Sequence, residues 1–335
     1  MELHQLRVLR ELTERGSVRA AAQALYITPS AVSQHLKALQ RSAGTPLVTH
    51  EGRRLVLTDA GRALAAAAVE VERSMALARN AIERDADRCD RVVTIAAFPS
   101  AGRVFLPRIA ARFAGVDGHV VDGHVLDGHV VDGQGAGVRG SGGLRVALAD
   151  HDAAPEQTAA LCGDHDVVIA HRWRIDTPWP ADRVAVTSLL DEPYDVALPA
   201  HHALAQRTQL TPQDLHGVTW IAGQEGWAPA GIITAIGAVA GREPEVRHRI
   251  NDLATAVALV REVGGVTLVP RFVGDYLVRD GVVTRPLSGV ESRREVAALS
   301  RPDRAVSAAV VGVVAALGEI AEQLRAGHHW RPPAL

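Results

Sequence analysis

Four polar residues near the N-terminus have the types and the spacing of a surface that reads DNA. They recur at i, i+3, i+4 and i+7 and so share one face of a helix: Ser30, Ser33, Gln34 and Lys37. Glutamine can bond an adenine edge bidentately, serine hydroxyls reach bases or phosphates, and lysine contacts guanine or a phosphate. We therefore predict that this face contacts base edges in the major groove. The alternative is an ordinary solvated helix surface.

The residues before this face predict a helix-turn-helix over about 18–37. Residues 18–24 (VRAAAQA) form a short helix with inward apolar side chains, and Tyr26 and Ile27 are expected to fill the corner after it. Thr28 suits the N-cap of the next helix and Pro29 its first position, where no N–H is needed, and both are included among the expected DNA contacts. The apolar residues of that helix fall at i, i+4 and i+7 and should face the core: Val32, Leu36 and Leu39.

A β-hairpin is predicted directly after the second helix. Gly44, Thr45 and Pro46 break the helix, residues 47–50 and 54–57 suit two short strands, and residues 51–53 suit the tip between them. Such a hairpin would lie beside the reading helix as a wing. Arg53 and Arg54 would then run along the phosphate backbone or enter the minor groove, where the negative potential favours arginine.

A long helix is predicted from residue 58 to residue 84. Asp59 lies in its first turn, where a negative charge suits the helix dipole. Its apolar residues recur at steps of 4, 3, 4, 3 and 4, the period of a coiled-coil seam: Leu64, Ala68, Val71, Met75, Ala78 and Ile82. We favour a dimer seam over a helix that packs only on its own domain.

These features together resemble the winged helix-turn-helix and linker helix of LysR-type transcriptional regulators. The pattern covers residues 1 to about 84 and is carried by Leu6, Leu12, Gly16-Ser17, Ala20-Ala21-Ala22, Leu25, Thr28 to Ser33, Leu36, Leu39, Gly44, Pro46-Leu47, Leu57-Thr58 and Ala60-Gly61. One departure is Val48, Thr49 and His50, where the family usually has phenylalanine, an acidic or polar residue and an arginine. Phosphate contact is therefore expected from Arg53 and Arg54 instead. The resemblance implies a dimer or tetramer that binds promoter or operator DNA, a small effector and RNA polymerase.

Composition agrees with a regulator of two or three domains. The 335 residues are 47% hydrophobic, enough to bury sizeable cores. Residues 1–84 hold 12 Lys/Arg against 8 Asp/Glu, whereas residues 85–335 hold 24 against 30, so only the first part suits a polyanion. Two cysteines, Cys89 and Cys162, argue for a reducing compartment, with a redox-sensing pair as a lesser alternative. No signal peptide or membrane span is recognisable, so we expect cytoplasmic residence.

Residues 91–324 alternate apolar runs with helical patterns, as in an α/β domain, and the overall fold class is α/β. Strands are expected at 91–97, 144–149, 167–170, 184–190, 194–198, 218–222, 266–269, 282–287 and 295–299, and helices at 100–113, 252–263 and 305–324. The resemblance implies a two-lobed effector domain akin to periplasmic binding proteins. Lobe I would span about 91–190 and 287–324, and lobe II about 191–286.

In such a fold a small ligand lies between the lobes, at the ends of strands and the starts of helices. Ser100 and the backbone amides of Ala101 and Gly102 are expected to form a helix N-terminus that could hold an anionic effector. His171 and Trp173 follow one expected strand and Gly223 follows another, so we include them in the effector site. Their plainer interpretations are an N-cap, a surface loop and a turn.

The segment 115–143 is a low-complexity insertion. Its five-residue repeat (DGHVVDGHVLDGHVVDG, residues 117–133) offers histidines and aspartates to a divalent metal, which makes a metal-responsive regulator an alternative. The spacing matches no calcium or zinc motif, so we favour a disordered, tandemly expanded loop and assign no metal site. Residues 327–335 are expected to be a disordered tail.

Sequence motifs of catalysis are missing. No G-x-S-x-G, H-E-x-x-H or P-loop occurs, so we expect neither an enzyme nor a cofactor. An enzyme fused to a DNA-binding head is therefore disfavoured. An architectural DNA-binding protein that ignores small molecules remains the other alternative.

Overall fold

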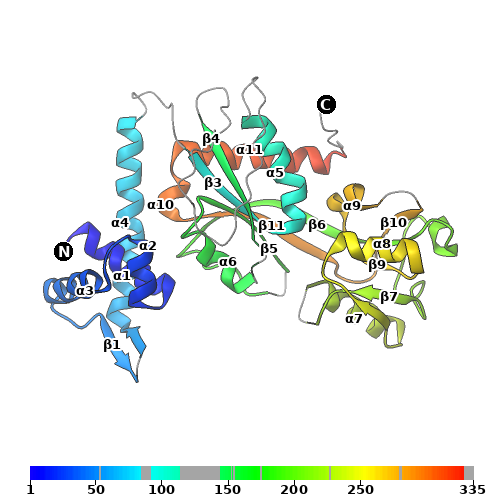
Figure 1. Ribbon diagram of the computed structural model, residues 1–335, viewed down its shortest axis with the longest axis horizontal. Coiled ribbons are helices and arrows are strands. Elements are labelled where there is room, and N and C mark those ends of the chain that lie inside the picture. Colours follow the sequence, from blue (N-terminus) through cyan, green and yellow to red (C-terminus); the bar gives the residue numbers. More distant parts are fainter. Residues whose placement is uncertain are drawn as a thin grey trace.

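The computed structural model describes residues 1–52, 54–83, 92–113, 144–151, 153, 155–173, 176–225, 228–278 and 281–327. The N-terminal domain lies at one end, next to a long helix, and a domain of two lobes extends from it (Figure 1). The repeat at 117–133, Cys89 and the tail from 328 onward lie outside the described residues, so the predictions made for them stay predictions.

The first domain is a winged helix-turn-helix. Its elements are α1 (Leu3–Arg15), α2 (Val18–Ala24), α3 (Pro29–Ala43), β1 (Val48–Glu51) and β2 (Arg54–Leu57). The Ser17 side chain accepts a hydrogen bond from Ala20 N and caps α2, while Gly44 ends α3 in the left-handed conformation. Leu9 and Leu12 of α1, Ala21 of α2 and Leu39 of α3 are buried together, so the three helices share one core.

The corner between α2 and α3 corrects one expectation. Tyr26 does not fill the corner, because its side chain is 96% exposed and Ile27 is also exposed. Tyr26 instead occupies the left-handed region at φ 54°, which reverses the chain between the helices and turns the ring toward solvent.

Helix α4 (Asp59–Glu83) begins where the wing ends. The Thr58 hydroxyl donates to the Pro46 carbonyl at 2.8 Å and accepts from Gly61 N at 3.0 Å. Gly61 lies so close to β1 that a Cβ there would come 2.0 Å from the Leu47 carbonyl oxygen. The helix can therefore start against the wing only because residue 61 is glycine.

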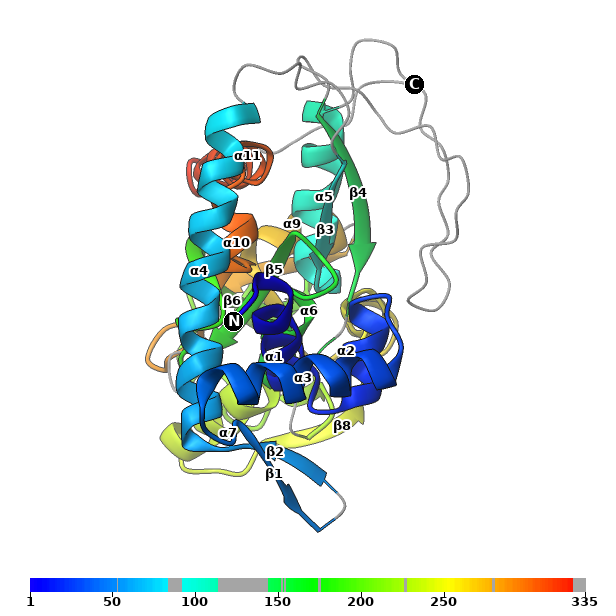
Figure 2. The same ribbon diagram turned by 90° about the vertical axis from the view of Figure 1, so that its left-hand side faces the viewer.

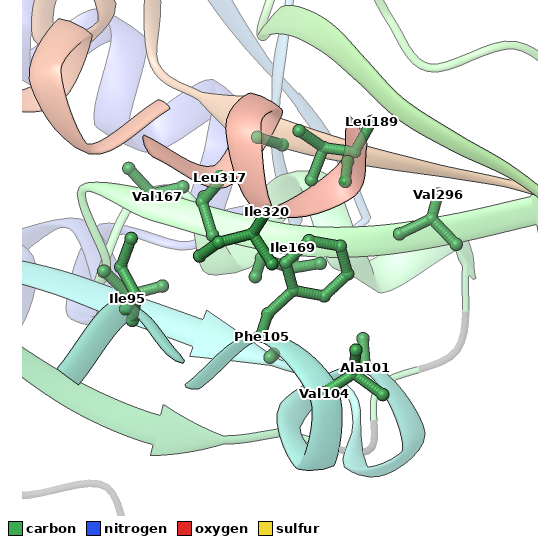
Figure 3. Packing of buried hydrophobic residues seen from close by; sticks show 14 of the residues in the cluster. Ile95, Ala101, Val104, Phe105, Val167, Ile169, Leu189, Val296, Leu317 and Ile320 are labelled. Atoms are coloured by element: carbon green, nitrogen blue, oxygen red, sulfur yellow. The ribbon is translucent and has the colours of Figure 1, made fainter. Parts of the chain in front are cut away.

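Lobe I consists of a β-sheet with helices packed against it. It contains β3 (Val92–Ala97), α5 (Pro99–Phe113), β4 (Arg145–Asp150), α6 (Pro155–Leu161), β5 (Val167–Trp173), β11 (Arg293–Ser300), α10 (Pro302–Ala305) and α11 (Ala308–Arg325). These strands belong to a larger sheet that continues through β6 (Ala185–Pro199) into lobe II, in the order β10 (Val282–Pro286), β6, β11, β5, β3, β4, with β9 (Thr267–Pro270) also paired to β6. Helices α5 and α11 cover one face, where Phe105, Leu317 and Ile320 pack on Ile95 and Ile169 (Figure 3).

Lobe II follows the long strand β6 (Ala185–Pro199). It contains the short 3-10 helix η1 (Ala203–Gln206), β7 (Thr219–Ala222), α7 (Ala228–Ala240), β8 (Glu245–Arg249), α8 (Leu253–Val263), β9 (Thr267–Pro270), α9 (Arg271–Leu277) and β10 (Val282–Pro286). Trp220 and Ile236 lie in its core. Figure 1 shows this lobe at the end of the molecule opposite to the winged helix-turn-helix.

The lobes are joined by β6 and by the return of the chain into β11. We expected two strands at 184–198, but β6 is continuous: it pairs with β11 up to Pro193 and with β9 and β10 from Tyr194 onward. Backbone partners on both sides of Pro193 keep the strand extended. The single helix expected at 305–324 is also wrong in its start. Val306 and Ser307 are not helical and separate the short helix α10 from α11, which begins at Ala308.

No helix in the described part of the chain is both long enough and apolar enough to cross a membrane.

Candidate DNA-binding and effector sites

The predicted reading face lies open on α3. The apolar residues Val32, Leu36 and Leu39 are buried, and the polar residues of the opposite face are exposed: Ser30, Ser33, Gln34 and Lys37. Figure 2 shows α3 running across the surface, with the wing projecting beside it. The arrangement allows α3 to enter a major groove while the wing lies next to it.

Hydrogen bonds within α3 divide this face into two kinds of residue. Thr28 Oγ1 accepts from Ala31 N at 3.2 Å and lies 2.9 Å from Ser30 Oγ, and Ser33 Oγ donates to the Pro29 carbonyl at 3.0 Å. These hydroxyls are therefore engaged with their own helix. Gln34 and Lys37 have exposed side chains without a hydrogen-bond partner among the described residues. These two side chains of the face are therefore not engaged with their own helix.

The wing is tied to α3 by one side chain. Gln40 Oε1 accepts from the backbone N–H groups of Leu47 and Val48 at 2.9 and 3.2 Å. Gly52 makes the turn at φ 60°. Arg54 begins β2 opposite Glu51. Arg53 and the side chain of Arg54 lie outside the described residues, so their predicted contacts with the DNA backbone stay predictions.

The predicted dimer seam needs correction in the first half of helix α4. Ala68 is fully buried in the core of its own domain, and Leu64 packs against the same core, because this half of α4 lies on α1. Ala68 is therefore not free to meet a partner subunit, whereas Leu64 is half-buried. The second half keeps an exposed apolar face, with Val71 43%, Met75 42% and Ile82 76% exposed, and Ala78 exposed between them.

Three of the predicted effector residues lie together around a buried arginine that the sequence analysis missed. Arg294 on β11 donates to Glu192 Oε2 at 2.5 and 2.8 Å, to Tyr194 Oη at 3.1 Å and to Ser100 Oγ at 3.1 Å. The rings meet in pairs: Phe98 and His171 lie edge to face with 4.5 Å between their centroids, and Trp173 and Tyr194 are tilted by 34° with 5.4 Å between theirs. We call this set the effector cluster: Phe98, Ser100, His171, Trp173, Glu192, Tyr194 and Arg294.

The cluster is electrostatically balanced. Burial opposes the charge of Arg294, but the adjacent Glu192 outweighs it, and the pKa of Arg294 is raised. The guanidinium also lies over the rings of Phe98 and Tyr194, at 4.8 and 5.3 Å from their centroids. Because Glu192 supplies the opposite charge and Phe272 N donates to its other oxygen at 3.2 Å, neither charge is isolated.

His171 and Trp173 offer unused hydrogen-bonding atoms to this cluster. Within the described residues, His171 Nδ1 and Trp173 Nε1 are buried without a hydrogen-bond partner. Burial lowers the pKa of His171 to about 3, and the positive charge of Arg294 contributes to this shift, so the imidazole is neutral at physiological pH. A small pocket lined by Phe98, His151 and His171 adjoins the His171 ring.

Two other expectations about the effector site need correction. The amide of Gly102 is not available to an anion, because it donates to the Phe98 carbonyl at 2.9 Å, and Ala101 and Gly102 are buried in α5. Gly223 belongs to a separate pocket in lobe II, lined also by Asn251 and Thr267. A contact between lobes lies near it, where Arg103 on α5 comes 3.8 Å from Asp252 at the start of α8.

The described cysteine is a buried thiol. Cys162 lies in the core under α6, where burial raises its pKa to about 12. A thiol reacts as its thiolate, so this side chain is unreactive near neutral pH. Among the described residues there is no group of three or more potential metal ligands.

The open reading helix with its wing, the linker helix and the two-lobed α/β domain define a transcriptional regulator that binds DNA. A family model described as "Bacterial regulatory helix-turn-helix protein, lysR family" matches residues 3–62, and one described as "LysR substrate binding domain" matches residues 143–322, more than half of the chain. The chain belongs to the LysR family of transcriptional regulators.

Individual proteins agree with this placement. The chain is 24% identical over 295 residues to the Hca operon transcriptional activator HcaR of Escherichia coli, covering 86% of this chain and 88% of that one. It is 23% identical over 305 residues to the hydrogen peroxide-inducible genes activator of Dickeya chrysanthemi, covering 90% of each. A full-length OxyR structure from Pseudomonas aeruginosa matches with a TM-score of 0.60 and 16% identity over 96% of this chain and 95% of that one, which supports the fold.

Proposed function

We propose that this regulator reads operator DNA through α3 and the wing, and that a small effector binds at the effector cluster between the lobes. The observation that carries the proposal is the meeting of Ser100, Tyr194 and Arg294 at the strands that join the lobes. A ligand there would contact α5, β5, β6 and β11 together and so bias the position of one lobe against the other.

The chemistry of the cluster favours a particular kind of effector. An anion would compete with Glu192 for Arg294, so the cluster has no unpaired positive charge to offer. The aromatic rings and the unpartnered His171 Nδ1 and Trp173 Nε1 suit a ligand with a flat apolar body and a few hydrogen-bonding groups. Cys162 gives no support for sensing of peroxide, because burial keeps it a thiol.

Base reading by Gln34 is tested by one substitution. Gln34→Ala should weaken binding to the cognate operator by about 1–3 kcal/mol and binding to scrambled DNA by much less, because a base-edge contact is lost. Lys37→Ala is the matched control: if Lys37 contacts phosphate, both duplexes lose affinity evenly and the salt dependence falls by about one counterion. Titrations at several salt concentrations measure both. An unchanged sequence preference in Gln34→Ala would contradict the reading role of this face.

We also propose that the exposed face of the second half of α4 forms the dimer seam: Val71, Met75, Ala78 and Ile82. The seam would bring two reading helices to a two-fold DNA site, and pairing of dimers into tetramers would add further contacts. We propose in addition that the DNA-bound protein recruits RNA polymerase. DNA binding and recruitment would both take place in the cytoplasm.

A charge placed in the seam tests this dimer. Val71→Asp should raise the dimer dissociation constant about a hundredfold, because a carboxylate would be buried without a partner. Leu77→Asp is the matched control, since Leu77 is 48% exposed on the same helix but lies about 200° around it from Met75. Sedimentation equilibrium gives both constants. Equal effects of the two substitutions, or none from Val71→Asp, would refute the seam.

A further inference from the structure

The DNA-binding domain and lobe I of the same chain meet through charged side chains. Arg301, just after β11, has Nη1 2.7 Å from Glu11 Oε1 and 3.5 Å from Glu14 Oε2 on α1. Asp303 on α10 is 3.5 Å from Arg10. Glu72 on α4 pairs with Arg10 and lies 3.8 Å from Arg301. We call this set the docking cluster: Arg10, Glu11, Glu14, Glu72, Arg301 and Asp303.

Two contacts flank the cluster. Arg15 at the end of α1 forms a two-point ion pair with Asp164 of lobe I, at 2.7 and 3.1 Å. Asn80 Nδ2 on α4 donates to the Val306 carbonyl at 2.6 Å. Figure 1 shows α10 lying against α4, so the contact runs along both the reading domain and its linker helix.

The contact is buried but not apolar. Arg10, Glu11, Glu72 and Arg301 are each at most 6% exposed. Within the described residues, none of the buried hydrophobic clusters contains residues of both domains. If the domains part, water therefore solvates charges and no large apolar surface is exposed.

Burial of these charges is costly, which favours a contact that can open. Burial lowers the pKa of Arg10 and raises the pKa of Glu14, so each charged form is disfavoured in the docked state. Attraction between the two signs offsets this cost only while the partners stay in place. A contact of this kind specifies one geometry without holding it strongly.

One strand leads from the docking cluster to the effector cluster. Arg294 lies at the start of β11, and Arg301 follows its end directly. A strand advances about 3.3 Å per residue, so the two arginines are roughly 23 Å apart on one rigid element. β11 pairs with β5 on one side and with β6 on the other. A shift of β5 or β6 would therefore move β11, and with it both Arg294 and Arg301.

We propose that lobe I carries a docking surface for the DNA-binding domain of its own chain, and that β11 couples this dock to the effector cluster. The coupling rests on the proposed effector site, whereas the dock does not. In the docked state the reading face of α3 remains exposed. The dock therefore sets where the reading helix lies relative to that of the partner subunit, and its release changes the spacing of DNA that the dimer can span.

Distances within the full-length protein test the dock without any effector. Spin labels at Gln23→Cys on α2 and Gln157→Cys on α6, both exposed, report the separation of the two domains in a Cys89→Ser background. Dilution with unlabelled protein removes distances between subunits. The buried Cys162 remains unlabelled as a thiol.

Arg301→Gln removes the cation that faces Glu11, Glu14 and Glu72. Asp164→Arg instead places an arginine beside Arg15 at the edge of the contact, where residue 164 is 55% exposed and tolerates a larger side chain. Each should raise the population of long distances about tenfold over the parent. There are two matched controls. Arg73→Gln breaks the exposed ion pair with Glu70 on α4, and Glu262→Arg breaks the exposed ion pair with Arg261 on lobe II. Both should leave the distances unchanged.

The outcomes separate the two parts of the proposal. A parent without a defined short distance, or distances unchanged in Arg301→Gln and Asp164→Arg alike, would overturn the dock. Tyr194→Phe, which removes the hydroxyl that accepts from Arg294, tests the coupling: a changed population of long distances supports it, and an unchanged one refutes it. Failure of a ligand to bind would leave the dock result standing, since no ligand enters the experiment.

Discussion

Arg294→Met should lower the free energy of unfolding of the effector domain by about 3–5 kcal/mol, because it leaves the carboxylate of Glu192 buried without its partner. Both side chains are 3–4% exposed, so water cannot replace the lost guanidinium. Methionine matches much of the arginine stem in volume, and the loss therefore reports the missing charge and hydrogen bonds more than a cavity.

The neighbouring residue supplies the control. Arg293→Met breaks an exposed pair with Asp191, where the two side chains are 52% and 41% exposed. Surface pairs contribute about 0–1 kcal/mol, so this variant should stay near the parent. Denaturant unfolding of the full chain, followed by tryptophan fluorescence, compares the two. Similar losses in both variants would show that the Arg294–Glu192 pair is not a buried electrostatic unit.

Gly61→Ala should lower the free energy of unfolding of the winged helix domain by about 1–3 kcal/mol, although alanine is the better helix former. The added Cβ would lie 2.0 Å from the Leu47 carbonyl oxygen, which is backbone and cannot swing away. Helix α4 must then move off the wing, so operator affinity should fall together with stability.

The same substitution at Gly312 provides the opposite expectation. Gly312 lies in α11, and a Cβ added there would meet no atom within 4 Å, so alanine should stabilise the domain by up to about 1 kcal/mol. Thermal unfolding and operator titration of both variants measure the difference. A destabilisation by Gly312→Ala equal to that of Gly61→Ala would mean that close approach to Leu47 is not the cause.

The DNA-binding domain was predictable because its determinants are local. Thr28 caps α3 through a bond to Ala31 N, Pro29 occupies the first helical position, and Gly44 ends the helix. The spacing of Val32, Leu36 and Leu39 alone decided which face is buried. Each of these effects acts within a few residues, where the sequence carries nearly all the information.

Helix α4 shows where periodicity becomes insufficient. The apolar repeat from Leu64 to Ile82 is continuous in the sequence, yet its first half packs on α1 and its second half is exposed. A heptad pattern specifies that a face will be covered but not by which surface. Only the docking of α1 along the first turns decided that Ala68 belongs to the core of its own domain.

The effector cluster depends on contacts between residues far apart in the chain. Ser100, His171 and Trp173 were predicted from their places at a helix start and a strand end, whereas Glu192 and Arg294 were missed. Arg294 looks like a surface residue beside Arg293, and its partner Glu192 is 102 residues away. The antiparallel register of β6 and β11 brings the two opposite each other, and no local pattern encodes that register.

The sequence by itself therefore determined the elements of the winged helix-turn-helix, the exposed polar face of α3, the family and the general alternation of strands and helices in the two lobes. The tertiary structure alone decided which charges become partners: Glu192 with Arg294 inside the effector cluster, and Glu11 with Arg301 between the domains. The physical reason is that caps and periodic burial are properties of single elements, whereas the pairing of buried charges depends on how separate elements are placed against one another.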